Sequence, residues 1–232
     1  MQDIQQKSVL IIGVTGETGT RLAKILVANG TQVIGLHRKA GQAKSLADMG
    51  IQPALADLVT ITPEELAEAA RSCGAIVFTA GASGGGDAMT DAIDGEGVRK
   101  AIAAAKIAGI KRLILVSAFP DAWRERRMPP DFEHYMFVKR QADVALSATD
   151  LDWVILRPGT LLNTPDTGQV RTDVAIPYGD VSRDDVAGVI AELLFRPDVT
   201  RVIIELTEGD TPIADAVAGM ALFSGKPAGE HH

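Results

Sequence analysis

Three evenly spaced glycines stand in the segment VLIIGVTGETGTRLAKILVANG, which runs from Val9 to Gly30. An apolar run precedes them and an amphipathic stretch follows, so the segment predicts a buried strand, a turn and a helix. Gly13 suits the tight turn, Gly16 lets the backbone approach a pyrophosphate, and Gly19 lets the helix pack closely on the strand. The helix N-terminus would face the phosphates with its free N–H groups. A glycine-rich turn without a ligand is the alternative.

Short apolar runs with little polar alternation recur along the chain, as in strands that are buried on both faces. They lie at Val9–Ile12, Val33–Leu36, Ala54–Leu55, Ile76–Phe78, Leu113–Val116, Val154–Leu156 and Val202–Glu205. Helical patterns separate them, at Thr20–Ala28, Ala40–Met49, Pro63–Ser72, Asp91–Ala108, Lys139–Ala148 and Arg183–Phe195, with a last helix from Pro212. This alternation predicts an α/β fold with a doubly wound parallel sheet, right-handed crossovers and helices on both faces.

No repeat or low-complexity linker interrupts the pattern, which favours a single domain over residues 1–230. Two insertions, near residues 120–132 and 161–178, follow predicted strands at their carboxyl ends, where doubly wound sheets bind ligands. The final two histidines are interpreted as the remnant of a purification tag and carry no argument.

The overall composition excludes several classes of function. The net charge is −7 and the longest basic run is RERR, so a nucleic acid partner is not expected. No apolar stretch reaches the roughly 18 residues that span a bilayer, and the first residues lack the pattern of a signal peptide. The single cysteine, Cys73, suits a reducing compartment, so we expect a cytoplasmic protein. No metal site is expected.

The segment GLHRKAG after the second predicted strand bears on cofactor choice. NAD-specific sites place an acidic residue here for the ribose 2′-hydroxyl, and this segment has none. Arg38 and Lys39 are able to bind a 2′-phosphate instead, with the guanidinium also stacking on adenine. The segment therefore favours NADP(H), with NAD(H) as an option and a solvated basic pair as the alternative.

A Tyr-x-x-x-Lys spacing follows the fifth predicted strand. Ser117 ends that strand, and Tyr135 and Lys139 stand on one face of a predicted helix. The Lys139 ammonium is expected to lower the pKa of Tyr135, so that the phenol passes a proton to or from a substrate oxygen. Ser117 would hydrogen-bond the same oxygen. Tyr135 as an ordinary helix residue is the alternative, since the spacing alone is common.

The segments GVTGETG, DAIDGEGVRKAIAAAKIAGIKRLILVSAF, HYMFVKRQADVALSATDLDWVILRPGTL and VSRDDVAGVIAELL together resemble the atypical short-chain dehydrogenases/reductases, in particular the NAD(P)H-binding flavin/biliverdin reductase-like and NmrA-like group. The resemblance implies a Rossmann domain of about seven strands in the order 3-2-1-4-5-6-7, with a small C-terminal substrate lobe. It implies cofactor contacts from Gly13, Thr15, Gly16, Glu17, Thr18, Gly19, His37, Arg38, Lys39, Asp57, Leu58, Thr79, Ala80, Gly81, Lys139, Pro158 and Gly159, and catalysis by Ser117, Tyr135 and Lys139.

Several residues keep two readings. Asp57 suits an adenine contact or a turn cap, and Arg157 suits the nicotinamide or a structural ion pair. Trp123 and Phe132 either line a substrate pocket or anchor their loop. Many members of the group carry a lysine where Met89 or Thr90 stands here.

Three functions are compatible with these patterns. An NADPH-dependent reductase of a small carbonyl, quinone or flavin-like substrate is the first. A non-catalytic NADP(H) sensor is the second. A sugar-nucleotide epimerase is the third, although the residues after the sixth strand are few for a substrate domain of that kind. The expected partner is a small-molecule substrate, and the chain is expected to be a monomer or homodimer.

Overall fold

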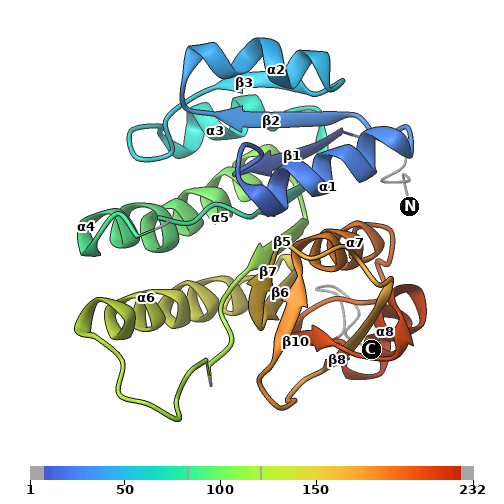
Figure 1. Ribbon diagram of the computed structural model, residues 1–232. Coiled ribbons are helices and arrows are strands. Elements are labelled where there is room, and N and C mark those ends of the chain that lie inside the picture. The colour runs from blue at the N-terminus through green and yellow to red at the C-terminus, as the bar shows by residue number, and fades with distance from the viewer. Residues whose placement is uncertain (1–7, 83, 121, 226–232) are drawn as a thin grey trace, which may run out of the picture.

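The computed structural model describes residues 8–82, 84–120 and 122–225. The N-terminal residues judged to lack a signal peptide, the final histidines and both ends of the predicted 1–230 domain lie outside these ranges. Figure 1 shows one continuous twisted sheet with helices packed against it. The strands are β1 (Ser8–Ile12), β2 (Val33–His37), β3 (Gln52–Leu55), β4 (Cys73–Phe78), β5 (Arg112–Val116), β6 (Asp152–Pro158), β7 (Thr160–Leu162), β8 (Gln169–Asp173), β9 (Asp180–Ser182), β10 (Val202–Glu208) and β11 (Thr211–Pro212).

Helices separate the strands from β1 to β6, whereas β6 to β9 follow one another without a helix. The helices are α1 (Glu17–Ala28), η2 (Ala40–Gln42), α2 (Ala43–Asp48), α3 (Pro63–Ala69), α4 (Asp87–Thr90), η3 (Asp91–Glu96), α5 (Gly97–Ala108), α6 (Pro130–Ser147), α7 (Arg183–Leu194), α8 (Ile213–Gly219) and η4 (Met220–Phe223). The predicted strands and helices are all found, with shifted bounds. The start of α3 has the expected local cause, because Thr62 Oγ1 accepts from the Glu65 amide and Glu65 Oε2 accepts from the Thr62 amide.

The central strands are apolar along their whole length because both sheet faces are covered. In β1, Val9 and Ile11 pack in a core with α1 and α7, whereas Leu10 and Ile12 pack in a second core with α3, α5 and α6. Successive side chains of a strand point to opposite faces, so a strand between two helical layers needs apolar residues at every position. Figure 1 shows α1 and α7 along one face, with α5 and α6 on the other.

The main sheet has nine strands in the order β11-β8-β10-β6-β5-β4-β1-β2-β3. Seven of them, from β3 to β6 and then β10, pair in parallel and give the expected order 3-2-1-4-5-6-7. Two further strands extend this order at one edge, because β8 from the insertion 161–178 pairs antiparallel with β10 and with β11. Gly209 allows this pairing, since a Cβ there would collide with the backbone of Val170 and Arg171.

The helix that carries Tyr135 begins earlier than the pattern predicted. The expected helix starts at Lys139, whereas α6 starts at Pro130, inside the insertion near residues 120–132. Proline is favoured in the first turn of a helix, and the acidic residues Asp131 and Glu133 complement the helix dipole there. Tyr135 and Lys139 are therefore both well inside a regular helix.

Candidate functional site

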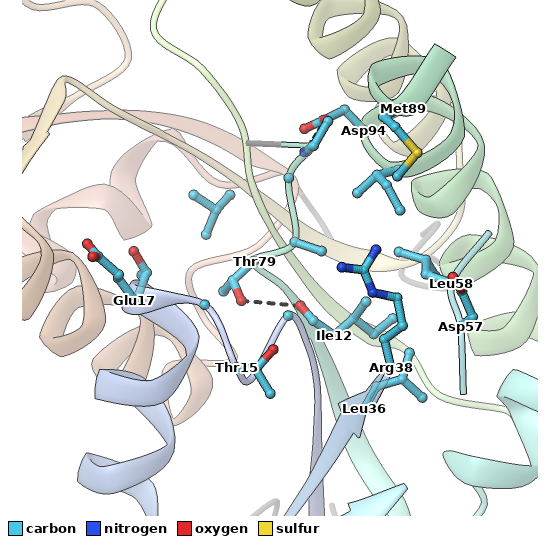
Figure 2. Close-up of a pocket in the computed structure, with 18 of the residues that line it drawn as sticks. Ile12, Thr15, Glu17, Leu36, Arg38, Asp57, Leu58, Thr79, Met89 and Asp94 are labelled. Atoms are coloured by element: carbon cyan, nitrogen blue, oxygen red, sulfur yellow. Dashed lines mark hydrogen bonds between the residues drawn. The ribbon is translucent and has the colours of Figure 1, made fainter. Parts of the chain in front are cut away.

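A cavity of about 690 Å³ opens at the carboxyl ends of the parallel strands, around the glycine turn. Figure 2 shows Thr15 and Glu17 on one side of it and Arg38, Leu58 and Asp57 on the other. Of the predicted site residues, the cavity is lined by Gly13, Thr15, Gly16, Glu17, Thr18, Arg38, Lys39, Asp57, Leu58, Thr79, Ala80, Gly81, Ser117, Tyr135 and Lys139. Residues from five separate strand ends thus meet at one place.

Each of the three positions in the turn requires or favours glycine for a different structural reason. Gly13 has φ +97°, and a Cβ there would lie 2.5 Å from the amide nitrogen of Ala80. A Cβ on Gly19 would collide with the carbonyl of Gly13, so Gly19 serves close packing beneath the turn and does not line the cavity. Gly16 lines the cavity, and a Cβ there would approach only the Gly13 carbonyl, at 3.2 Å.

The N-terminus of α1 is left without a side-chain cap. Its N-cap residue is Gly16, and the first helical hydrogen bond of the turn runs from the Thr20 amide to the Gly16 carbonyl at 2.9 Å. The amides of the first helical turn have no carbonyl partner within the helix. An uncapped helix end beside a cavity is suited to bind the phosphates of a dinucleotide, so the residues present fit that group.

The opposite side of the cavity carries the basic pair. Arg38 and Lys39 line it, next to Leu36 and Asp57, and in Figure 2 the guanidinium of Arg38 reaches into the space between Leu58 and Ile12. Asp57 Oδ1 accepts from the Val59 amide at 2.9 Å and so caps the turn. Asp57 also lines the cavity. The loop is further held by the ammonium of Lys100, which donates to the carbonyls of Leu58 and Val59.

Ser117, Tyr135 and Lys139 meet on one wall. The Lys139 ammonium donates to the Val116 carbonyl at 2.9 Å and lies 3.4 Å from Asp94 Oδ1. Ser117 is held through its own backbone, since its amide donates to the Leu156 carbonyl at 2.7 Å. Its Oγ is buried and has no hydrogen-bond partner among the described residues. A buried hydroxyl without a partner beside a cavity is ready to bind a ligand oxygen.

The Lys139 ammonium acts on the pKa of Tyr135 in the predicted direction, but the net shift of this pKa is upward. Burial raises the pKa of Tyr135 above its ordinary value of 10, and the carboxylates of Asp94 and Asp143 add to the increase. The ammonium of Lys139 lowers this pKa, but by less than burial raises it. Spacing shows which charge lies next to the phenol, whereas the loss of water around it depends on the tertiary structure. The phenol is therefore protonated at neutral pH.

Four predicted cofactor residues do not line the cavity. They are Gly19, His37, Pro158 and Gly159. His37 is 2% exposed and its Nδ1 is 3.0 Å from the Lys39 carbonyl. Pro158 lies buried in β6 beside Leu206, and a Cβ on Gly159 would collide with the carbonyl of Gly179. These positions support the sheet and its loops.

Arg157, Trp123 and Phe132, each with two interpretations above, make contacts within the protein and lie outside the cavity lining. Arg157 donates from Nε and Nη2 to Asp143 Oδ2, at 3.0 and 2.9 Å, and does not line the cavity. Trp123 and Phe132 also lie outside the lining, with ring centroids 5.5 Å apart. Phe132 packs in turn against Tyr135, with centroids 6.2 Å apart, so the insertion contacts a residue of the cavity lining.

Several lining residues had no predicted role, and they include Met89, Asp94, Leu161 and Arg183. Asp94 had a usable signal, because it shares the buried helix face of Gly97, Val98 and Ala101 at spacings of three, four and seven. An acidic residue in such a face needs a partner. It lies in η3, a π-helical turn of the kind that is frequent at functional sites.

Within the described ranges, no group of three or more His, Cys, Asp or Glu side chains is arranged to hold a metal ion. The helices in the same ranges include none that is both long enough and apolar enough to cross a bilayer.

Comparison with known proteins identifies the family of this chain. A family model for NAD(P)H-binding domains matches residues 13–197. YhfK of Bacillus subtilis, described as an uncharacterized sugar epimerase, is 41% identical over 215 residues, covering 90% of this chain and 98% of that protein. The oxidoreductase ylbE of Lactococcus lactis superposes with a TM-score of 0.81 at 26% identity, over 97% of this chain and 100% of the other. The anaerobillin reductase ChuY of Escherichia coli O157:H7 gives a TM-score of 0.73 at 29% identity, over 88% and 98%. The chain therefore has a Rossmann-like α/β fold and belongs to the NAD(P)H-binding family.

Proposed function

We propose that this protein is an NADP(H)-dependent reductase of a small carbonyl, quinone or flavin-like substrate. One observation carries the proposal: Ser117, Tyr135 and Lys139 line the same cavity as the glycine turn. Proton-transferring groups beside a nicotinamide site are what carbonyl reduction requires. The reductase and oxidoreductase among the structural neighbours support the same reaction class.

Each of the three side chains has a distinct task in this proposal. The bound nicotinamide supplies the hydride. The protonated phenol of Tyr135 donates a proton to the substrate oxygen, which suits its raised pKa. Ser117 Oγ, which is without a partner among the described residues, donates a hydrogen bond to the same oxygen. Lys139 stabilises the phenolate that remains until water returns the proton, since the Lys139 charge acts on Tyr135 to lower its pKa.

The preference for NADP(H) is part of the proposal. Arg38 and Lys39 give the cavity two cations at the position where NAD-specific sites carry an acidic residue. A guanidinium binds phosphate oxygens in a bidentate manner, so Arg38 is the residue expected to recognise the 2′-phosphate.

The test is NADPH oxidation, followed at the absorbance of the reduced nicotinamide, over a panel of quinones, flavins and aldehydes. Tyr135→Phe is expected to lower kcat by about 100-fold to 10,000-fold while the Kd for NADPH stays within about threefold. The chain has two tyrosines, and the other provides a matched control. Tyr178 hydrogen-bonds Thr160 outside the cavity, so Tyr178→Phe should keep its turnover. Equal turnover by wild type and Tyr135→Phe would contradict the role of Tyr135 as proton donor. NADPH binding with no turnover by either protein would favour a cofactor sensor.

An epimerase is the second candidate, because the relative YhfK is described as one. The cavity argues against it. Among the described residues that follow β6, only Leu161 and Arg183 line the cavity, which leaves little protein surface to recognise a sugar nucleotide. Incubation with UDP-glucose and oxidised cofactor should give no UDP-galactose, and measurable conversion would reverse this preference.

A further inference from the structure

Arg183 is a basic residue of the cavity lining that the reductase assignment leaves without a task. It is the first residue of α7, and its side chain is 23% exposed. The dipole of a helix favours acidic residues at its N-terminus, and Asp184 and Asp185 follow the arginine in the same turn. A cation at this position therefore has to be stabilised by contacts outside its own helix.

Those contacts hold the guanidinium at the edge of the glycine turn. Arg183 Nε lies 3.1 Å from Glu17 Oε2, and Nη1 donates to the Leu161 carbonyl at 2.9 Å and to Asn163 Oδ1 at 3.1 Å. Glu17 is the first residue of α1 and also lines the cavity. In Figure 2 Glu17 lies on the opposite side of the cavity from Arg38. Arg183 therefore supplies positive charge at the end that Arg38 does not reach.

The charged residues of the cavity indicate what the guanidinium of Arg183 does. The basic residues in the lining are Arg38, Lys39, Lys139 and Arg183. The ammonium of Lys139 contacts Asp94 and the Val116 carbonyl. Arg38 lies at the other end of the cavity in Figure 2, and Lys39 is its neighbour in the chain. The N-terminus of α1 is suited to bind phosphates. Glu17 places a negative charge beside it, and that charge would repel phosphates. Arg183 is the lining cation that neutralises it.

A second arginine, Arg21, shows what a purely structural role at this helix interface looks like. Arg21 of α1 makes the equivalent contact in the other direction, because its Nε lies 3.1 Å from Asp184 Oδ2 of α7. Its side chain is 26% exposed, close to the 23% of Arg183, but Arg21 does not line the cavity. The α1–α7 interface therefore already has an ion pair that joins the two helices.

We propose that Arg183 binds the pyrophosphate of the dinucleotide on the nicotinamide side, exchanging the Glu17 carboxylate for a phosphate oxygen. The proposal rests on NADP(H) binding and is independent of turnover. The guanidinium keeps its contacts to Leu161 and Asn163, which aim it at the turn. Glu17 then acts as a temporary partner that keeps Arg183 in place in the free protein.

Two ligands and four variants test this assignment by isothermal titration calorimetry. Arg183→Ala is expected to raise the Kd for NADPH about tenfold or more, because a charge-assisted phosphate contact is lost. Adenosine 2′,5′-bisphosphate ends at the adenosine-side phosphate, so its Kd should change less than about twofold. Arg183→Lys should lie between wild type and Arg183→Ala for NADPH. Glu17→Gln should bind NADPH more tightly than wild type, and Arg21→Ala should bind it as wild type does.

Other results would overturn the proposal in identifiable ways. Equal losses for Arg21→Ala and Arg183→Ala would show that the arginines only join α1 to α7. If Arg183→Ala left the Kd for NADPH unchanged but raised the KM for the compound that NADPH reduces, Arg183 would instead be assigned to an anionic group of that compound. Circular dichroism and thermal unfolding of each variant check that a loss of binding is not a loss of fold. The Tyr135→Phe result can fail while these bindings hold, so the two proposals fail separately.

Discussion

The ammonium of Lys139 lies 3.4 Å from Oδ1 of Asp94, and the two side chains are only 5% and 1% exposed. They are 45 positions apart in the chain and come from α6 and η3. Asp94 also accepts from the Ala82 amide through Oδ2, at 3.0 Å. One buried carboxylate thus holds both the lysine of the proposed catalytic set and the loop that follows β4.

Removing the carboxylate should destabilise the protein because it leaves the Lys139 charge buried and without its partner. Asp94→Ala is expected to lower the free energy of unfolding by about 3 kcal/mol or more. Asp94→Asn retains an acceptor for the Ala82 amide, so its loss should be smaller. Urea unfolding followed by circular dichroism measures both. The explanation would fail if Asp94→Ala unfolded at the urea concentration of the wild type.

The raised pKa of Tyr135 predicts a pH dependence of stability. Because the folded-state pKa lies above the unfolded value of 10, the protonated phenol's contribution is fully present below pH 10 and is lost as pH rises through the folded-state pKa. The unfolding free energy of wild type should therefore fall relative to Tyr135→Phe above pH 10, with a constant difference between pH 7 and 9. All other titratable groups are common to both proteins, so their contributions cancel in this difference. A difference that stays constant up to pH 11 would contradict the raised pKa.

Arg38 should decide between the two nicotinamide cofactors. Arg38→Ala is expected to raise the Kd for NADPH about tenfold or more and the Kd for NADH by less than about threefold, since only NADPH carries the 2′-phosphate. Fluorescence of the bound reduced nicotinamide measures both. Lys44→Ala is the matched control, because Lys44 pairs with Asp48 on the exposed face of α2 and does not line the cavity. Equal losses for both cofactors would remove Arg38 from the 2′-phosphate.

Gly159 should matter for stability more than for binding. A Cβ there would collide with the Gly179 carbonyl, so Gly159→Ala is expected to cost about 1–3 kcal/mol of unfolding free energy. Gly219 provides the control, since it has helical φ and ψ of −59° and −28° and no atom within 4 Å of an added Cβ. Gly219→Ala should be neutral or stabilise by up to about 1 kcal/mol. A stable Gly159→Ala protein with weakened NADPH binding would return Gly159 to the cofactor site.

Much of the site was predictable because its parts are local and repeat at strand ends. The glycine turn, Arg38, Asp57, Ser117 and the Tyr135–Lys139 pair each follow a strand, and parallel strands bring their carboxyl ends to one edge. His37 and Gly159 also follow or end strands but face the protein interior. That a residue lies at the end of a strand predicts the edge of the sheet at which it stands. Whether it lines the cavity or packs in the core depends on the direction of its side chain.

The sequence by itself determined the parallel α/β order, the capped start of α3 at Thr62 and the glycine turn between β1 and α1, because each depends on residues within about one helix or strand. The antiparallel strand β8, the Asp94–Lys139 pair and the Glu17–Arg183 pair depended on the tertiary structure. The pKa of Tyr135 depended on it as well. Each of these joins residues distant in the chain or depends on the exclusion of water, and neither distance in space nor dielectric surroundings is encoded in local spacing.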